Sequence, residues 1–270
     1  MRLLAHPCVF ATVTLLACTT SARAERPEDN YWLRIEGYYA KAESTARVDA
    51  TNGQTGTVIE FEKDLGLSET KATAAFLLGA RFFDNWRTEF EYYELKRNSS
   101  RVIDREISWG DTVYPISARL DASFDSTIYR WSTGYSFIKS TEAELGASLG
   151  LHVTSFGLAL SGSTGEGGAL QTERREQTVP LPTLGLYGTY AFSPEISMNG
   201  RADVLYLSYN EYSGRLLNFN LGVDWRFTKN FGVGVGYRFV DYQLDITRNS
   251  WHGEVNYKFS GPTVYLNAAF

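Results

Sequence analysis

The sequence predicts an all-β protein, a closed antiparallel transmembrane β-barrel of about ten strands. Ten segments alternate apolar and polar residues with a period of two, which is the side-chain period of a strand. The connections between these segments alternate between short turns and longer polar loops, a pattern typical of membrane barrels. Beyond Glu25 no apolar run approaches the ~18 residues of a membrane helix, so a membrane-spanning chain of this sequence would cross with strands.

The clearest alternation lies between Leu217 and Phe239. Two apolar faces, joined by the turn Thr228–Asn230, consist of Leu217, Phe219, Leu221, Val223, Trp225, Phe227 and of Phe231, Val233, Val235, Tyr237, Phe239. Polar residues and glycines fill the opposite faces. Each run is about the ~9–11 residues that a tilted strand needs to cross a bilayer, which predicts a membrane-spanning hairpin.

Eight further segments alternate in the same way. They cover about 31–41, 73–83, 86–93, 126–138, 144–153, 184–192, 196–206 and 255–270. In the last one the apolar phase breaks at Gly261 and Pro262. Because proline cannot donate to a strand ladder, we expect a β-bulge there.

The connections predict two different ends of the barrel. Tight turns follow every second strand, at Asp84–Asn85, near Ser140, at Ser193–Glu195 and at Thr228–Asn230, whereas the longest loops are Asp49–Lys71, Arg97–Ser117 and Ser161–Pro182. Aromatic residues gather at the short-turn end and predict an interfacial girdle: Tyr31, Trp32, Phe82, Trp86, Phe137, Phe192, Phe227, Phe231 and Phe270. Val58, Ile59 and Phe61 indicate that the first strand continues beyond the membrane or that its loop folds on itself, and the Gly/Ser-rich stretch 161–168 predicts a mobile loop.

The N-terminus has the features of a secretory signal. A short basic start precedes a mostly apolar run and the end Ala22-Arg23-Ala24, which predicts a cleaved segment 1–24 and a mature barrel domain 25–270. Leu15-Leu16-Ala17-Cys18 offers the alternative of lipidation at Cys18. Since both cysteines of the chain, Cys8 and Cys18, lie in the segment expected to be cleaved, we expect no disulfide framework in the mature chain. The net charge of −5 does not favour nucleic-acid binding.

A lipocalin-like or sandwich fold would also alternate, with its apolar face turned inward. The signal, the loop asymmetry, the girdle and the terminal Phe270 together instead resemble bacterial outer-membrane β-barrel proteins of the small porin-like, OmpA-type group. The resemblance implies export to the outer membrane, periplasmic turns, extracellular loops, and contact with outer-membrane lipid and lipopolysaccharide. It also implies that Phe270 is the signal read by the barrel-assembly machinery. The predicted strand count departs from the simplest members, which have eight.

If the apolar faces meet lipid, the opposite faces line the lumen. The charged residues on those faces nearly balance: Arg34, Glu36, Arg81, Arg87, Glu89, Glu91, Arg130, Glu144, Arg201, Asp203, Asp224, Arg226 and Arg238. A barrel of ten strands lies near the size at which side chains fill the interior, and an unpaired buried charge costs several kcal/mol. We therefore expect an interlocked charge network and a structural or surface-interaction role, with an unknown extracellular ligand. A narrow passive pore for small solutes is the alternative.

Hydrolysis is the third possibility, and we expect no catalytic site, cofactor or metal. Glu144, Ser148 and His152 share one strand face, but four residues along a strand span ~13 Å, whereas a nucleophile and its base lie within ~3 Å. His252, with Asp241 and Asp245 before it, resembles the Asp and His of ten-stranded outer-membrane proteases, although a second acidic pair is missing. The acidic loop residues Glu60, Glu62, Asp64 and Glu69 indicate a weak cation site or a solvated surface.

Overall fold

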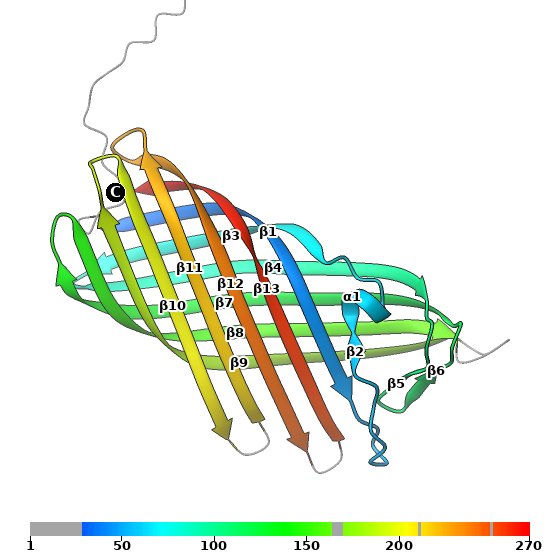
Figure 1. Cartoon of the computed structure of the whole chain (residues 1–270). Coiled ribbons are helices and arrows are strands. Elements are labelled where there is room, and N and C mark those ends of the chain that lie inside the picture. The colour runs from blue at the N-terminus through cyan, green and yellow to red at the C-terminus, as the bar shows by residue number, and fades with distance from the viewer. Residues whose placement is uncertain (1–28, 164–169, 210–211, 249–250) are drawn as a thin grey trace, which may run out of the picture.

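The structure, a computed structural model, describes residues 29–163, 170–209, 212–248 and 251–270, and in it ten long strands form one closed antiparallel barrel (Figure 1). They are β1 (Tyr31–Val48), β3 (Thr70–Phe82), β4 (Trp86–Val102), β7 (Arg119–Lys139), β8 (Ala143–Ser163), β9 (Leu170–Ala191), β10 (Ile196–Tyr209), β11 (Tyr212–Arg226), β12 (Phe231–Arg248) and β13 (Trp251–Ala269). Each pairs with the next, and β13 pairs with β1 to close the barrel. The predicted fold class and the predicted count of ten strands are confirmed.

The two ends of the barrel differ as predicted. Four tight turns follow β3, β7, β9 and β11, and all lie at one end, which we name the turn end. The opposite end, the loop end, carries the short elements β2 (Ile59–Glu60), α1 (Phe61–Asp64), β5 (Ile107–Trp109) and β6 (Thr112–Tyr114). No helix in the described ranges is long and apolar enough to cross a membrane.

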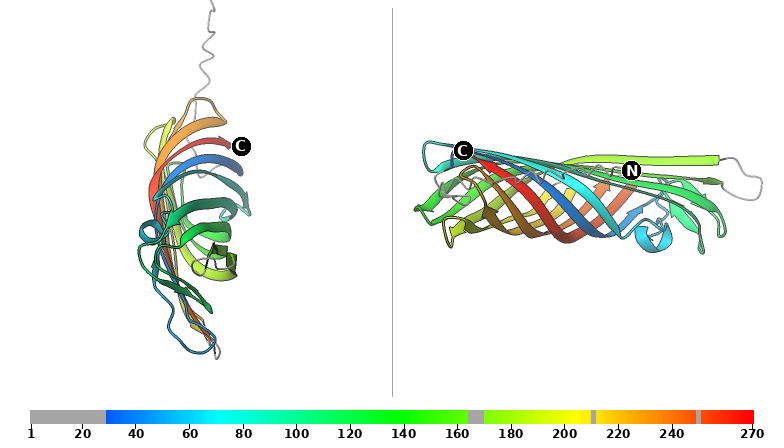
Figure 2. Two further views of the ribbon diagram at one scale, coloured as in Figure 1. Left: turned by 90° about the vertical axis from the view of Figure 1, so that its right-hand side faces the viewer. Right: turned by 90° about the horizontal axis from the view of Figure 1, so that it is seen from above.

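The strands are longer than the sequence indicates, because the barrel wall continues far past its apolar band. They contain 13 to 22 residues, against the ~9–11 that a bilayer requires. The expected loop Ser161–Pro182 is therefore wrong for residues 161–163 and 170–182, which belong to β8 and β9 and pair with each other. The expected loop Arg97–Ser117 is likewise wrong for residues 97–102, which belong to β4. Residues 164–169 of the loop expected to be mobile lie outside the described ranges. The green strands β7, β8 and β9 form the longest part of the wall in Figure 2.

The loop after β1 shows both of the expected features. The strand itself continues to Val48, and β2 folds back to pair with it at Thr45 and Ala46. The expected signal 1–24 and the lipidation alternative at Cys18 lie outside the described residues.

Apolar side chains cover the outside of the turn half of the barrel. Leu33, Phe76, Leu149, Leu221 and Val264 are among them, and all are exposed. Such a contiguous apolar band is stable only where lipid covers it. The predicted girdle at the turn end is also present, except for Trp32. The prediction was wrong for Trp32, because its side chain is buried in the lumen and its indole nitrogen donates a hydrogen bond to Glu89.

The loop half of the barrel has the opposite polarity. Outward positions there carry charges such as Lys41, Asp125 and Asp241, while inward positions carry buried apolar residues such as Phe124 and Val240. Each strand therefore keeps its alternation while its apolar residues move from the outer face to the inner face. The outside of the barrel meets lipid in the turn half and water in the loop half. Because apolar side chains avoid water, they point outward into lipid in the turn half and inward in the loop half.

The reversal also explains why the apolar alternation of β13 changes phase at Gly261 and Pro262. The β-bulge predicted there is wrong. β13 pairs with β12 in one register from Trp251 to Ala268, and its register with β1 is the same on both sides of Gly261 and Pro262. Tyr257 and Phe259 are inward residues of the loop half, whereas Val264 and Leu266 are outward residues of the turn half. A register shift occurs instead between Ser136 and Ile138.

Glycines of β12 make room for large inward residues of β13. A Cβ atom on Gly234 would lie 2.2 Å from the ring of Tyr265, its partner in the ladder. We therefore expect Gly234→Ala to destabilise the barrel by about 1–3 kcal/mol through overpacking, measured as the free energy of unfolding in urea. Gly200→Ala is the control, since a Cβ there would make an ordinary 3.5 Å contact with Leu221. Equal stabilities of the two variants would contradict this account of the glycine row.

Candidate functional site

The lumen of the turn half holds a continuous network of ion pairs. Five arginines and five acids are linked one to the next, and we name these ten residues the lumen network: Arg81, Glu144, Arg87, Glu89, Arg130, Arg201, Asp203, Glu91, Arg238 and Glu36. They come from β1, β3, β4, β7, β8, β10 and β12, so the network ties most of the barrel wall together. Equal numbers of positive and negative side chains leave it without net charge.

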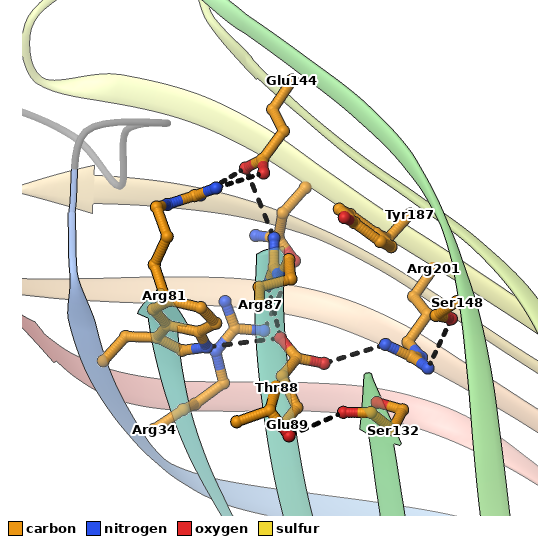
Figure 3. Close-up of polar contacts among 12 residues, drawn as sticks. Arg34, Arg81, Arg87, Thr88, Glu89, Ser132, Glu144, Ser148, Tyr187 and Arg201 are labelled. Atoms are coloured by element: carbon orange, nitrogen blue, oxygen red, sulfur yellow. Dashed lines mark hydrogen bonds and ion pairs between the residues drawn. The ribbon is translucent and has the colours of Figure 1, made fainter. Parts of the chain in front are cut away.

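Glu89 is the centre of this network (Figure 3). Its carboxylate lies 2.5 Å from Arg87, 2.9 Å from Arg201 and 3.4 Å from Arg130. Arg87 is in turn held between two aromatic rings, with its guanidinium carbon 4.5 Å from the centre of Trp32 and 4.6 Å from that of Tyr187. Three cations around one buried carboxylate fix the relative positions of β4, β7 and β10.

Glu144 and Glu91 extend the network away from Glu89 in two directions. Glu144 receives two hydrogen bonds from Arg81, of 2.8 and 2.9 Å, across the barrel. Glu91 joins Arg130, at 2.8 Å, to Arg238, whose guanidinium also lies 3.1 Å from Glu36.

Two of the predicted lumen charges on β11 pair outside this network. Asp224 lies 3.6 Å from Arg34, whose guanidinium stacks over the Tyr265 ring at 4.0 Å. Arg226 binds Asp29 at 2.7 Å, a residue that precedes the first strand and that no alternation pattern marks. Trp32 and Tyr187 also line the lumen, although the sequence pattern did not place them there. An aromatic side chain can face either lipid or the lumen, so its residue type alone does not predict which.

An aromatic layer closes the interior above the lumen network. Tyr38, Tyr93, Tyr242, Tyr257 and Phe259 are all buried, and their ring centres are 5.0 to 6.5 Å apart along the chain of contacts. The guanidinium of Arg238 lies 4.6 Å from the Tyr93 ring and so joins this layer to the network below. Burial raises the pKa of Tyr257, which keeps this phenol neutral. Between the layer and the turn end, a cavity of about 50 Å³ among the network residues has room for only a few water molecules.

A larger cavity lies above the aromatic layer, at the loop end. Its volume is about 280 Å³, and Phe61, Trp109, Phe124, Phe156, Leu158 and Leu244 supply most of its apolar lining. Elements of two loops cover it. Phe61 of α1 packs edge-on against Phe124 at 4.9 Å, and the hairpin of β5 and β6 brings Trp109 over the barrel interior.

Hydrogen bonds from three directions hold this hairpin in place. The Gly110 amide donates to the carbonyl of Val48 at 3.1 Å, and the Tyr114 hydroxyl donates to the carbonyl of Leu160 at 3.2 Å. Asp111 accepts hydrogen bonds of 2.8 and 2.9 Å from the amide and hydroxyl of Thr51. These two bonds lower the pKa of Asp111, so its carboxylate remains charged and the contact persists in mild acid.

The two histidines weighed as catalytic alternatives, His152 and His252, have contacts other than those that hydrolysis would require. His152 lies 3.8 Å from Asp203, whereas Ser148 accepts a hydrogen bond from Arg201 and Glu144 binds Arg81. The three residues of the considered triad thus have separate partners.

His252 contacts different groups from those that the sequence indicated. Arg47 lies 2.7 Å from its Nδ1 and Asp49 lies 3.5 Å from the same atom, while Asp241 pairs with Arg215. Because a guanidinium can only donate, Nδ1 accepts, and the neutral ring is protonated at Nε2.

The acidic residues of the first loop serve structural contacts. Glu62 accepts a hydrogen bond from the Ser44 amide and pairs with Arg97, and Asp64 pairs with Arg105. In the described part of the chain no group of three or more potential metal ligands occurs.

The fold that these features define is that of bacterial outer-membrane β-barrels. The outer membrane protease OmpT from Escherichia coli is similar in structure, with a TM-score of 0.61 and 12% identity over 93% of this chain and 100% of that one. The translocator domain of the autotransporter NalP from Neisseria meningitidis aligns with a TM-score of 0.47 and 13% identity, covering 88% of each chain. Ail, the attachment invasion locus protein of Yersinia pestis, solved with the heparin analogue sucrose octasulfate, aligns with a TM-score of 0.32 and 12% identity over 87% of this chain and 99% of that one.

Structural similarity at 12 to 13% identity establishes the fold alone, so function has to be argued from the residues of this chain. No protein-family model matches the sequence, and no curated protein matches it either.

Proposed function

We propose that this protein is a non-conducting, non-enzymatic barrel of the bacterial outer membrane whose loop end acts in surface interaction. The turn end then faces the periplasm, the apolar band contacts lipid and lipopolysaccharide, and Phe270 serves as the assembly signal. The proposal rests mainly on one observation: the neutral lumen network lies below a continuous aromatic layer.

The two layers oppose a pore for different physical reasons. The network fills the lumen with side chains that are fixed to one another, since Arg130 is 1% exposed and has acids on two sides. An ion that entered would have to displace these pairs. The aromatic layer above consists of apolar ring faces and neutral phenols, two of which already hydrogen-bond to Ser126 and Thr154, so it does not supply the set of oxygens that could replace the hydration shell of an ion.

The surface-interaction role is supported by the construction of the loop half. A barrel that served only to fill the membrane could end at the upper edge of its apolar band, near Tyr39 and Tyr237. Here the strands continue with their own apolar core and a braced cap over a cavity. Such a structure presents a fixed shape to the medium outside the cell, which is a requirement for specific recognition.

Planar-bilayer recording tests the closed lumen. We expect the purified full chain, inserted into a bilayer, to give no steady ohmic current steps, because the lumen network and the aromatic layer leave no continuous water path. Flotation of the protein with liposomes confirms insertion independently of current. Reproducible single-level conductance from an inserted protein would overturn the proposal in favour of the narrow pore.

A further inference from the structure

The cavity at the loop end has the features of a binding site for a small molecule. Its volume of about 280 Å³ lies near the lower limit of known ligand pockets and is almost twice that of a dry cavity of about 150 Å³ known to bind benzene. Because aromatic and aliphatic side chains form its walls, apolar surface of a ligand would leave water on entering.

Two buried polar atoms in this lining have no hydrogen-bond partner among the described residues, Arg47 Nε and the indole nitrogen of Trp109. Of these, Arg47 Nε lies 3.3 Å from the Asp49 carboxylate. Trp109 lines the cavity and is 2% exposed, and its indole N–H has no hydrogen-bond partner within the described part of the chain. A buried donor without an acceptor costs about 1–3 kcal/mol. A ligand that brought an acceptor would remove this cost, so the site favours molecules with one carbonyl, ether or hydroxyl oxygen.

The charged side chains at the mouth of the cavity pair with one another. Arg47 pairs with Asp49 at 3.3 Å and with Glu254 at 3.8 Å, and Arg175 lies 3.8 Å from Glu173. Glu176 pairs with Arg174. These three arginines and four acids leave one net negative charge at the mouth, which disfavours an anionic ligand, and the apolar walls disfavour burial of a cation.

We propose that this cavity binds a small, uncharged, largely apolar molecule that carries one hydrogen-bond acceptor, with Trp109 as the donor that recognises it. The inference rests on the proposed function, because the closed lumen below makes the cavity a dead end. Tyr242, Tyr257 and Phe259 separate the cavity from the lumen network. A bound molecule would therefore enter and leave the cavity through the loop end.

Two probes of nearly the same shape test the proposal. 2-Acetylnaphthalene has a carbonyl acceptor, and 2-ethylnaphthalene has a methylene group in its place. Isothermal titration calorimetry with the full chain in nanodiscs, corrected with empty nanodiscs, should give about two- to tenfold tighter binding of the ketone, as one net hydrogen bond provides.

Three variants locate the site and its donor. Trp109→Phe keeps an apolar aromatic ring, smaller than indole, and removes the N–H, so the preference for the ketone should disappear while ethylnaphthalene still binds. Ala46→Phe fills the cavity from β1 and should weaken both probes at least tenfold. Ala159→Phe is the control, since this residue lies next to Leu158 but on the outer face of β8, and it should change neither affinity.

The outcomes separate this inference from the proposed function. A ketone preference that survives Trp109→Phe, or binding that survives Ala46→Phe, would overturn the inference, as would a failure of wild-type protein to bind either probe. Trp109→Phe adds no bulk to the cavity and remains informative if Ala46→Phe does not fold. None of these results changes the expected bilayer recording, so a silent barrel that binds neither probe would refute the cavity ligand alone.

Discussion

Replacing Glu89 with leucine should destabilise the barrel by about 3–5 kcal/mol, the usual cost of removing one partner from a buried ionic cluster. Arg87, Arg130 and Arg201 would then surround an apolar side chain, and the lumen network would carry one excess positive charge. Unfolding in urea, followed by tryptophan fluorescence in lipid vesicles, measures the loss.

A second substitution distinguishes uncompensated charge from lost packing. Adding Arg87→Met to Glu89→Leu restores neutrality at nearly constant volume, and we expect the double variant to recover part of the lost stability. Glu94→Leu is the matched control on the same strand. Its side chain is 38% exposed and points outward to Lys96, so its removal should change stability little. Similar losses for Glu89→Leu and Glu94→Leu would show that the lumen network does not support the barrel.

Much of the barrel could be predicted because alternation reports directly on the two faces of a strand. The ten strands, the four tight turns and the charged lumen all follow from residues whose polarity differs between adjacent positions. The same signal could not show where apolar residues stop facing lipid and begin facing the interior. Tyr257 and Val264 both look like outward residues of one strand, and only their burial in the folded barrel separates them.

The site at the loop end was beyond prediction for a related reason. The elements that form it are short, with three residues in β5 and four in α1, too few for any periodicity to be detected. Trp109 therefore looks like an ordinary loop residue. Its contacts depend on pairing between segments far apart in the chain, such as Gly110 with Val48.

Arg97 shows how an apparent loop charge can be buried. The sequence places it at the start of a polar loop, yet its side chain points inward from β4 and is fully buried. It lies 2.5 Å from Glu62, donates to the Ser44 hydroxyl at 2.6 Å and to the Ser68 carbonyl at 3.2 Å, and so ties α1 to the barrel wall. Its guanidinium also lies 5.4 Å from the ring centre of Phe124.

Substituting Arg97 with leucine should therefore release α1 while the ten strands stay folded. Two of the three hydrogen bonds of Arg97, those to Glu62 and Ser68, hold the segment around α1. Their loss amounts to at least about 3 kcal/mol, which raises the population of the open segment roughly a hundredfold. Because proteolysis of a rapidly opening segment follows that population, trypsin should cleave at Lys63 faster by a similar factor.

Lys96→Leu, which changes the exposed neighbour of Arg97, should leave the cleavage rate unaltered. An unchanged rate in Arg97→Leu would mean that Phe61 and its apolar contacts hold α1 without the ion pair. Since Arg97 and Glu89 share no partner, their effects on cleavage and on global unfolding should be independent of each other.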